Sequence, residues 1–240
     1  MNTLPNECYD MIFNNFQYEY NDLFSCALVN RQWCRIIIPI LWRDPYFKLE
    51  DIRFIRTLLL TLNVEEQTLL IPFNITLPSY SKPLFEYTCY ITSINSDLYK
   101  GIRNWLSFDG AKNLLHAIKS SLIVMFLRTS GTLKDLRLDE IICNQLLFEK
   151  LYENTTVTHV SLFISYKVND DLLSKSIDRL VKFVNKNSTL TCFNLTSIRL
   201  GIKGVKTLLE ALYKNTVLNS LGFFGNRIVD AILDQKEEKQ

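Results

Sequence analysis

Four short stretches in the second half of the chain decide its fold: LKDLRL at 133–138, VTHVSL at 157–162, LTCFNL at 190–195 and LNSLGF at 218–223. In each stretch the first, fourth and sixth residues are apolar, and successive stretches begin 24, 33 and 28 residues apart. The alternation of apolar and other residues predicts a short β-strand with one buried side. The recurrence predicts an array of similar units.

Helical stretches separate these strands, most clearly at 172–184 and 205–213. A strand and a helix repeated every 20–29 residues or so, with one longer unit, resemble leucine-rich repeats. The last unit, Leu221-x-Phe223-x-x-Asn226-x-Ile228, is similar to the consensus of that family. The resemblance implies an α/β region at 129–234, a short leucine-rich-repeat solenoid in which a curved parallel sheet carries outer helices. A polar tail follows at 235–240.

The repeats are degenerate, because the positions equivalent to Asn226 hold Ile141, Ser165 and Ile198. The ladder of asparagines that the consensus would supply is therefore not expected in the earlier units. A different set of asparagines follows the helical stretches, each with Ser or Thr directly after it: Asn154, Asn187 and Asn215. Because asparagine tolerates the left-handed conformation, we expect these three residues to close the helices.

One face of the predicted sheet carries the candidate target-binding residues. Stacked units align their strands into one sheet, and alternation turns every second side chain away from the core. The outward residues that we assign to target binding are Arg137, Asp139, His159, Phe163, Asn194, Thr196 and Phe224. The third outward position of each strand should form a row of Asp139, Phe163, Thr196 and Phe224. Exposed phenylalanines in such a row suggest anchors for a partner protein, although both could instead pack under flanking loops.

The first 47 residues predict three short helices. Apolar residues recur from Cys8 to Phe16, in a helix that Pro5 would open. Asn21 and Asn30 are suited to cap the next two helices, and Pro39 is expected to interrupt the third. So small a unit buries too little surface to be stable alone, so its apolar residues should meet the rest of the chain or another protein.

This segment resembles the F-box motif in order and spacing. The matching residues are Leu4-Pro5-x-Glu7, Ile12 with Phe16, Leu23-x-x-Cys26-x-Leu28-Val29-x-Arg31-x-Trp33 and Pro39-x-Leu41-Trp42-Arg43. F-box domains dock on the Skp-type adaptor of cullin ubiquitin ligases. The resemblance implies an adaptor-facing surface made of Leu4, Pro5, Ile12, Phe16, Leu23, Cys26, Val29 and Trp33. The alternative is a helical hairpin in which these residues are only core.

Residues 48–128 predict a helical intermediate region. Leucines and isoleucines between 52 and 62 mark one helical face, and a second runs from Leu114 to Met125, with Ser107 or Asp109 as its cap. The junction at 41–45, followed by a leucine-rich helical segment, is similar to large fungal families of F-box proteins.

Composition favours binding over catalysis. The 240 residues include 27 Lys and Arg against 25 Asp and Glu, a formal charge of +2 that gives no basis for nucleic-acid binding. With two histidines and seven glycines, the chain has no phosphate-loop, nucleophile-elbow or zinc-protease motif. We expect no enzymatic activity, no cofactor and no metal. A remote alternative is a cysteine/histidine enzyme, with His159 and Cys192 on neighbouring strands.

The start of the chain lacks the basic and apolar regions of a signal peptide, and its apolar runs are shorter than a membrane span. We therefore expect an intracellular protein, cytoplasmic and/or nuclear and not secreted, without membrane contact and with reduced thiols.

The leading interpretation is a substrate-recognition subunit of a Skp–cullin–F-box ubiquitin ligase. The F-box would bind the Skp adaptor, and through it a cullin, while the repeats would bind an unknown protein target. An alternative is a scaffold or regulatory binding protein with the same two parts and no role in ubiquitination.

Overall fold

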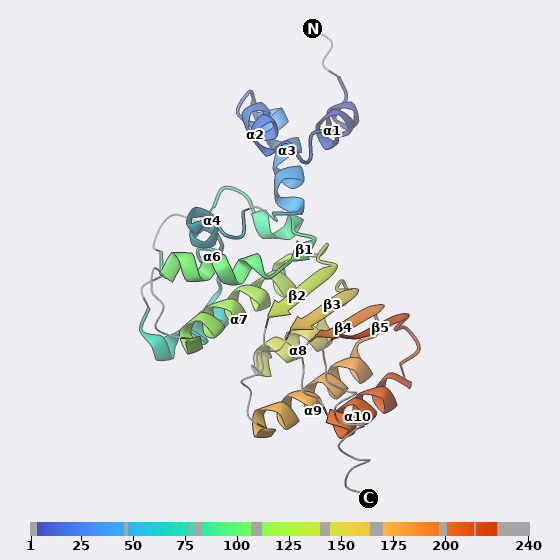
Figure 1. Ribbon diagram of the computed structural model, residues 1–240. Helices are drawn as coiled ribbons and strands as arrows, with labels where there is room; N and C mark the ends of the chain where they lie inside the picture. Colours follow the sequence, from blue (N-terminus) through green and yellow to red (C-terminus); the bar gives the residue numbers. More distant parts are fainter. Residues whose placement is uncertain are drawn as a thin grey trace, which may run out of the picture.

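The computed structural model describes residues 4–45, 48–75, 77–78, 83–106, 112–139, 145–163, 170–196, 201–213 and 215–224. Figure 1 shows two parts: a small helical unit at the N-terminal end, and below it a larger body in which a parallel sheet is lined by helices.

The N-terminal helical unit, residues 4–45, consists of three helices as predicted. They are α1 (Asn6–Asn14), α2 (Tyr20–Ala27) and α3 (Arg31–Arg43). Asn30 caps α3 as expected, since its side chain accepts a hydrogen bond from the Trp33 amide. Asn21 does not cap α2, because the helix already begins at Tyr20 after Glu19.

The expectation that Pro39 interrupts the third helix is wrong, because α3 runs through it to Arg43. A proline inside a helix removes one backbone hydrogen bond. The next turn is held by other contacts, since Ile40 is buried in the core of the unit and Trp42 packs on the body.

In the described parts of the intermediate region, the regular elements are helical with one exception. Its elements are α4 (Ile52–Leu59), α5 (Val64–Thr68), η1 (Ile71–Phe73), η2 (Tyr87–Tyr90), β1 (Ser93–Ile94), α6 (Asp97–Leu106) and α7 (Lys112–Thr129). The exception is β1, a two-residue strand that pairs in parallel with the first predicted strand. The sheet therefore starts inside the region predicted to be only helical. The proposed caps Ser107 and Asp109 lie outside the described residues.

The body contains a five-stranded parallel sheet in the order β1-β2-β3-β4-β5. After β1 its strands are β2 (Asp135–Asp139), β3 (His159–Phe163), β4 (Cys192–Thr196) and β5 (Ser220–Phe224). The connecting helices are α8 (Gln145–Glu153), α9 (Asp170–Lys186) and α10 (Gly201–Tyr213). Helices α7 to α10 line one face of this sheet (Figure 1). Neighbouring strands are thus successive in the chain, as a stack of strand-helix units requires.

The register confirms the predicted alignment of the strands. Asp139 pairs with Phe163, Phe163 with Thr196 and Thr196 with Phe224. The alternate residues of β2 to β4 point inward and are buried, as the leucine pattern predicts.

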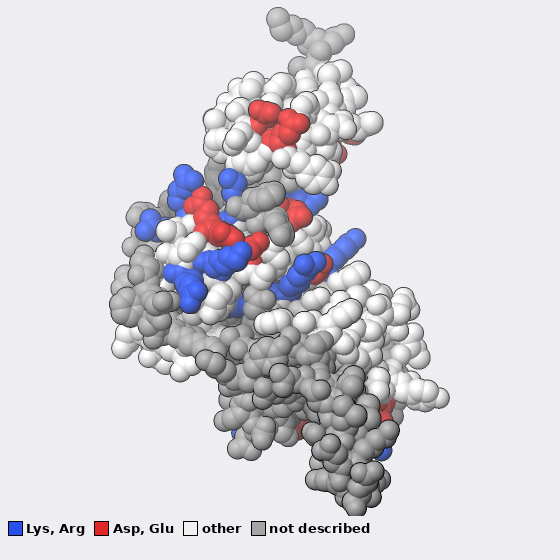
Figure 2. All heavy atoms as spheres, in the orientation of Figure 1, with Lys and Arg blue, Asp and Glu red and all other residues white. Residues whose placement is uncertain are grey.

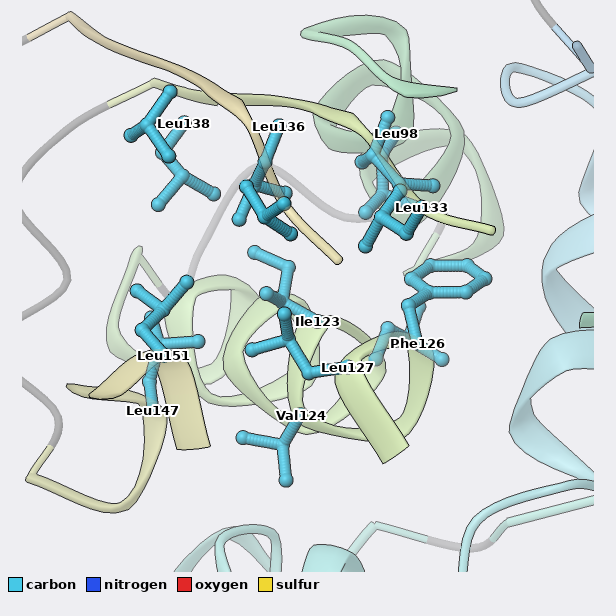
Figure 3. Packing of buried hydrophobic residues seen from close by; sticks show 14 of the residues in the cluster. Leu98, Ile123, Val124, Phe126, Leu127, Leu133, Leu136, Leu138, Leu147 and Leu151 are labelled. Carbon is cyan, nitrogen blue, oxygen red and sulfur yellow. The ribbon is translucent and has the colours of Figure 1, made fainter. Parts of the chain in front are cut away.

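One buried cluster runs through the body from Leu49 to Leu208. Figure 3 shows Ile123 and Phe126 of α7 below Leu136 of β2 and Leu98 of α6, and all four belong to this cluster. The boundary predicted between residues 128 and 129 therefore does not separate two cores. The N-terminal helical unit has its own cluster of Phe13, Leu23, Ala27, Ile37 and Ile40.

The asparagines after the helices act differently from the prediction. Among the described non-glycine residues only Asn74 has a left-handed backbone, with φ of 48°, so Asn154, Asn187 and Asn215 do not close helices in that way. Instead each side-chain oxygen accepts hydrogen bonds from two backbone amides in the turn before the next strand. An Asn side chain can fold the turn without a strained backbone.

The same asparagines connect successive units. Each donates from Nδ2 to a carbonyl of the preceding unit: Asn154 to Leu127, Asn187 to Leu151 and Asn215 to Val184, at 3.5, 3.4 and 2.7 Å. An asparagine ladder therefore exists in this sheet, at the helix-to-strand turns and not at the consensus positions. Asn226 and the positions Ile141, Ser165 and Ile198 lie outside the described residues.

An ion pair between a buried glutamate and an exposed arginine anchors α5 to α7, and nothing in the sequence pattern indicates it. Glu66 is fully buried and receives two bonds from the Arg128 guanidinium, at 2.6 and 3.0 Å. The same carboxylate completes the capping box of α5 with Asn63. The Glu66 carboxylate raises the pKa of Arg128 above its usual value.

Candidate functional site

The N-terminal helical unit is held together by a small aromatic core. The Trp33 ring meets Phe13 edge-on at 5.1 Å and Tyr9 at 5.7 Å, joining α1 to α3. Leu23 and Ala27, one turn apart on α2, complete this core. With its few large side chains facing inward, the unit leaves many other apolar side chains on its surface.

Five of the eight predicted adaptor-binding residues are exposed: Leu4, Pro5, Ile12, Phe16 and Val29. The other three are not free surface. Cys26 and Trp33 are half-buried against the core, and Leu23 is only 1% exposed. Leu23 lies with Ala27 on the buried face of α2. It therefore packs beneath the exposed surface and is not part of that surface.

The predicted surface leaves out other exposed apolar residues of this unit, among them Met11, Phe24 and Leu28. Each directly neighbours a predicted residue in the chain. The prediction followed one apolar stripe per helix, and in α2 that stripe is the buried one. They could have been identified as apolar residues that lie next to the core-facing stripe of a helix but are not part of it.

The junction between the N-terminal helical unit and the body is built around Trp42. Its ring stacks on Phe54 of α4 at 4.6 Å and on Tyr87 of η2 at 4.4 Å. Burial at this place raises the pKa of the Tyr87 hydroxyl. Beside it, a groove of about 460 Å³ is lined by residues that include Tyr20, Trp42 and Lys48, and the Lys48 ammonium lies 3.7 Å from the Tyr20 ring centre.

Backbone hydrogen bonds continue across this junction into the sheet. The Arg43 carbonyl, at the end of α3, accepts from the Thr92 amide at 2.8 Å, just before β1. The same bond recurs from strand to strand. The Lys134 amide donates to the Thr92 carbonyl, the Thr158 amide donates to the Lys134 carbonyl, and the Thr191 amide donates to the Thr158 carbonyl. Ser93 also donates to the Asp44 carboxylate. The last helix of the N-terminal unit is therefore the first member of the series that aligns the strands.

The open face of the sheet, opposite helices α7 to α10, holds the predicted target-binding residues. Arg137, His159, Phe163 and Phe224 are exposed, with Phe163 at 43% and Phe224 at 63%, while Asn194 and Thr196 are half-buried. Arg137 approaches Asp135 of its own strand at 3.8 Å. Asp139 occupies its predicted place in the row, but its side chain lies outside the described part of the structure.

His159 and Cys192 are direct neighbours across β3 and β4, as predicted from the repeat. Each of them contacts a neutral polar group. His159 Nδ1 lies 2.8 Å from the Thr158 hydroxyl, and the Asn194 amide approaches Cys192 Sγ at 3.6 Å. These contacts fix two polar side chains on the open face.

In the part of the chain that the structure describes, no three His, Cys, Asp or Glu side chains are grouped so as to hold a metal ion. Nor does any described helix combine the length and the apolar character needed to cross a membrane.

Comparison with known protein families bears on the N-terminal unit. Residues 1–48 match the F-box-like family, a span that covers α1 to α3 and the junction with Trp42. No curated protein matches the chain. The match supports an F-box protein, and since F-box domains generally bind Skp-type adaptors, it suggests an adaptor role for the N-terminal unit.

Proposed function

We propose that this protein is a substrate-recognition subunit of a Skp–cullin–F-box ubiquitin ligase. The observation that carries the proposal is the F-box-like match over a helical unit whose apolar side chains are largely exposed. In this proposal Ile12, Phe16 and Val29 contact the adaptor directly, together with Met11 and Leu28. Leu23 and Trp33 shape that surface from the core.

The body is, in this proposal, a short array of leucine-rich repeats that holds a protein target on its open face. The parallel strand-helix stack and the asparagines at equivalent turns support this assignment. The similarity to fungal F-box families with such repeats belongs to the same proposal.

The junction suits a subunit that positions one protein against another. The stacking of Trp42 and the Arg43–Thr92 hydrogen bond connect the N-terminal unit to the body. They therefore hold the adaptor-binding surface in a fixed position relative to the open face of the sheet. A rigid link raises the effective concentration of a held target near the conjugating enzyme. The covalent chemistry then belongs to other subunits, so this chain needs no catalytic residues and no cofactor. It would act inside the cell, in the cytoplasm and/or the nucleus.

Co-purification with a Skp-type adaptor tests the proposal. An aspartate at Val29 or Ile12 should reduce adaptor binding at least about tenfold, because a charge buried at an apolar interface is strongly unfavourable. Leu209→Asp is the matched control, since Leu209 on α10 is as exposed as Ile12 and lies in the body. If the unmodified chain does not bind the adaptor, or Val29→Asp binds as well as Leu209→Asp, the proposal is wrong.

Reconstitution with cullin, conjugating enzyme and a captured target separates a ligase subunit from a scaffold. We expect ubiquitin to be attached to the target only when this chain and the cullin are both present. Capture of the target without any conjugate would assign the chain to the scaffold class.

A further inference from the structure

Charge is unevenly distributed over the open face of the sheet. The outward positions of β2 hold Asp135, Arg137 and Asp139, whereas the nine outward positions of β3, β4 and β5 hold no Asp, Glu, Lys or Arg. In Figure 2 charged side chains gather in a band over α4, α6 and β2, and the surface over β3 to β5 in this view is uncharged. Among the residues that the structure describes on β3 to β5, none offers a charged partner to a ligand that lies across this face.

The row at the carboxyl ends of these strands places two exposed phenylalanines on either side of a threonine. Phe163 on β3 and Phe224 on β5 flank Thr196 on β4, each aligned with it by the strand register. Strands lie about 4.8 Å apart, so the two phenylalanine backbones are separated by roughly 10 Å. Thr196, which lies between them in the register, is a small, half-buried residue.

Gly222 and Asn194 lie next to this row. A Cβ atom on Gly222 would lie 2.3 Å from Asn194 Oδ1 and 2.7 Å from Cε2 of the Phe224 ring. Only glycine lets both groups lie over the β5 backbone at this point. The Asn194 amide donates weakly, to Ser161 and Cys192 at 3.5 and 3.6 Å. Such an amide can exchange these long contacts for hydrogen bonds to the backbone of a ligand.

We propose that this row is a clamp for an extended, uncharged segment of the target protein. One apolar side chain of the segment lies between Phe163 and Phe224 above Thr196, and the Asn194 amide binds its main chain. This inference rests on the proposed function of the open face as the target-binding surface. The lack of charge on β3 to β5 argues for an uncharged segment, because a charged one would lose its hydration without compensation.

Selection from a phage-displayed library of random 12-residue peptides on the full-length chain tests the clamp. Enriched peptides should share a central apolar residue with no charged residue within two positions of it. A synthetic peptide of the enriched sequence should bind Phe163→Ala and Phe224→Ala at least about tenfold more weakly, since buried aromatic anchors dominate interface energy.

Gly222→Ala provides a sharper variant, because it removes no aromatic ring and only displaces Phe224 or Asn194. It should weaken the same peptide, whereas Gly131→Ala should not, since a Cβ on Gly131 meets nothing within 4 Å. Charged consensus peptides, no enrichment, or equal binding by the Gly222 and Gly131 variants would overturn the clamp. Light scattering tests a second copy as occupant: a dimer that Phe163→Ala dissociates would also overturn it.

All these variants should bind the Skp-type adaptor like the unmodified chain, because Phe163, Gly222 and Phe224 lie in the body. If the peptide results contradict the clamp and the unmodified chain still binds the adaptor, only the clamp is refuted and the proposed F-box function is not. Loss of adaptor binding by the unmodified chain would instead refute the proposed function.

Discussion

The N-terminal helical unit and the sheet body use apolar residues in opposite ways. The unit buries a cluster of five residues and leaves Ile12, Phe16 and Val29 exposed, while the body buries a much larger cluster that runs from Leu49 to Leu208. A small unit has too much surface for its volume to hide its apolar residues. The surface of the unit is therefore suited to a permanent partner. The surface of the body is suited to a partner that it contacts through a few apolar side chains.

The largest effect should follow from a cavity in the body. Phe193 is fully buried on β4 and meets Phe183 of α9 edge-on at 6.0 Å. Phe193→Ala should lower the free energy of unfolding by about 3–5 kcal/mol, measured by urea denaturation. Phe224→Ala, on the exposed side of the next strand, is the control and should change it by less than about 0.5 kcal/mol. Similar losses from both variants would contradict the one-sided burial of the sheet.

Separating the two regions at their junction should have the next largest effect. Trp42→Ala removes two stacked ring pairs, at 4.6 and 4.4 Å, together with a half-buried indole. We expect a loss of about 2–4 kcal/mol. Limited proteolysis should then cut between the unit and α4, while Trp105→Ala should leave that junction intact. An unchanged cleavage pattern would mean that Trp42 does not hold the two regions together.

Much of this comparison could be predicted from the sequence where the signal is periodic. The strand pattern predicts the register, including the neighbours His159 and Cys192, and the exposure of Phe163 and Phe224. The three N-terminal helices follow from their apolar spacing and the cap at Asn30. Period-2 and period-3.6 patterns carry this information because they specify which side of an element is buried.

What the sequence could not predict depends on contacts between distant residues. The strand β1 has two residues and no pattern of its own, and it forms because β2 offers it a partner. The sequence around Leu23 does not distinguish a buried leucine from an exposed one, because its burial depends on the packing of α3 against α2. Glu66 and Arg128 are 62 positions apart in the sequence, and the hydrogen bonds of the asparagine ladder join residues about 30 positions apart. No local pattern specifies such pairs.

A smaller loss should follow from removing one step of the asparagine ladder. Asn187 is buried, and its side chain serves the amides of Thr189 and Leu190 and the Leu151 carbonyl. Asn187→Ala should lower the free energy of unfolding by about 1–3 kcal/mol, because it leaves buried backbone groups without partners. Hydrogen exchange of the Leu190 amide should rise in this variant and stay low in Thr191→Val. Unchanged exchange would show that the turn holds without the side chain.

The smallest effect concerns Asp51, at the start of the body. Its carboxylate caps α4 through the Arg53 amide at 2.8 Å and pairs with the Arg53 guanidinium at 2.9 Å, and the hydrogen bond to the Arg53 side chain lowers the pKa of Asp51. A lowered pKa in the folded state means that the stabilisation is complete above the ordinary pKa of aspartate, near 3.9 or so, and is lost as the pH falls through the lowered value.

Asp51→Asn keeps an acceptor for the cap but does not titrate. The unmodified chain should therefore be the more stable of the two at pH 7, and the difference should shrink as the pH falls below about 4 and disappear below the lowered pKa of Asp51. Because the pair is largely exposed, the difference should be smaller than that of Asn187→Ala. Thermal unfolding of both proteins across this range measures it. A difference that stays constant with pH would mean that the carboxylate acts only as a cap and that its charge contributes nothing to the attachment of α4.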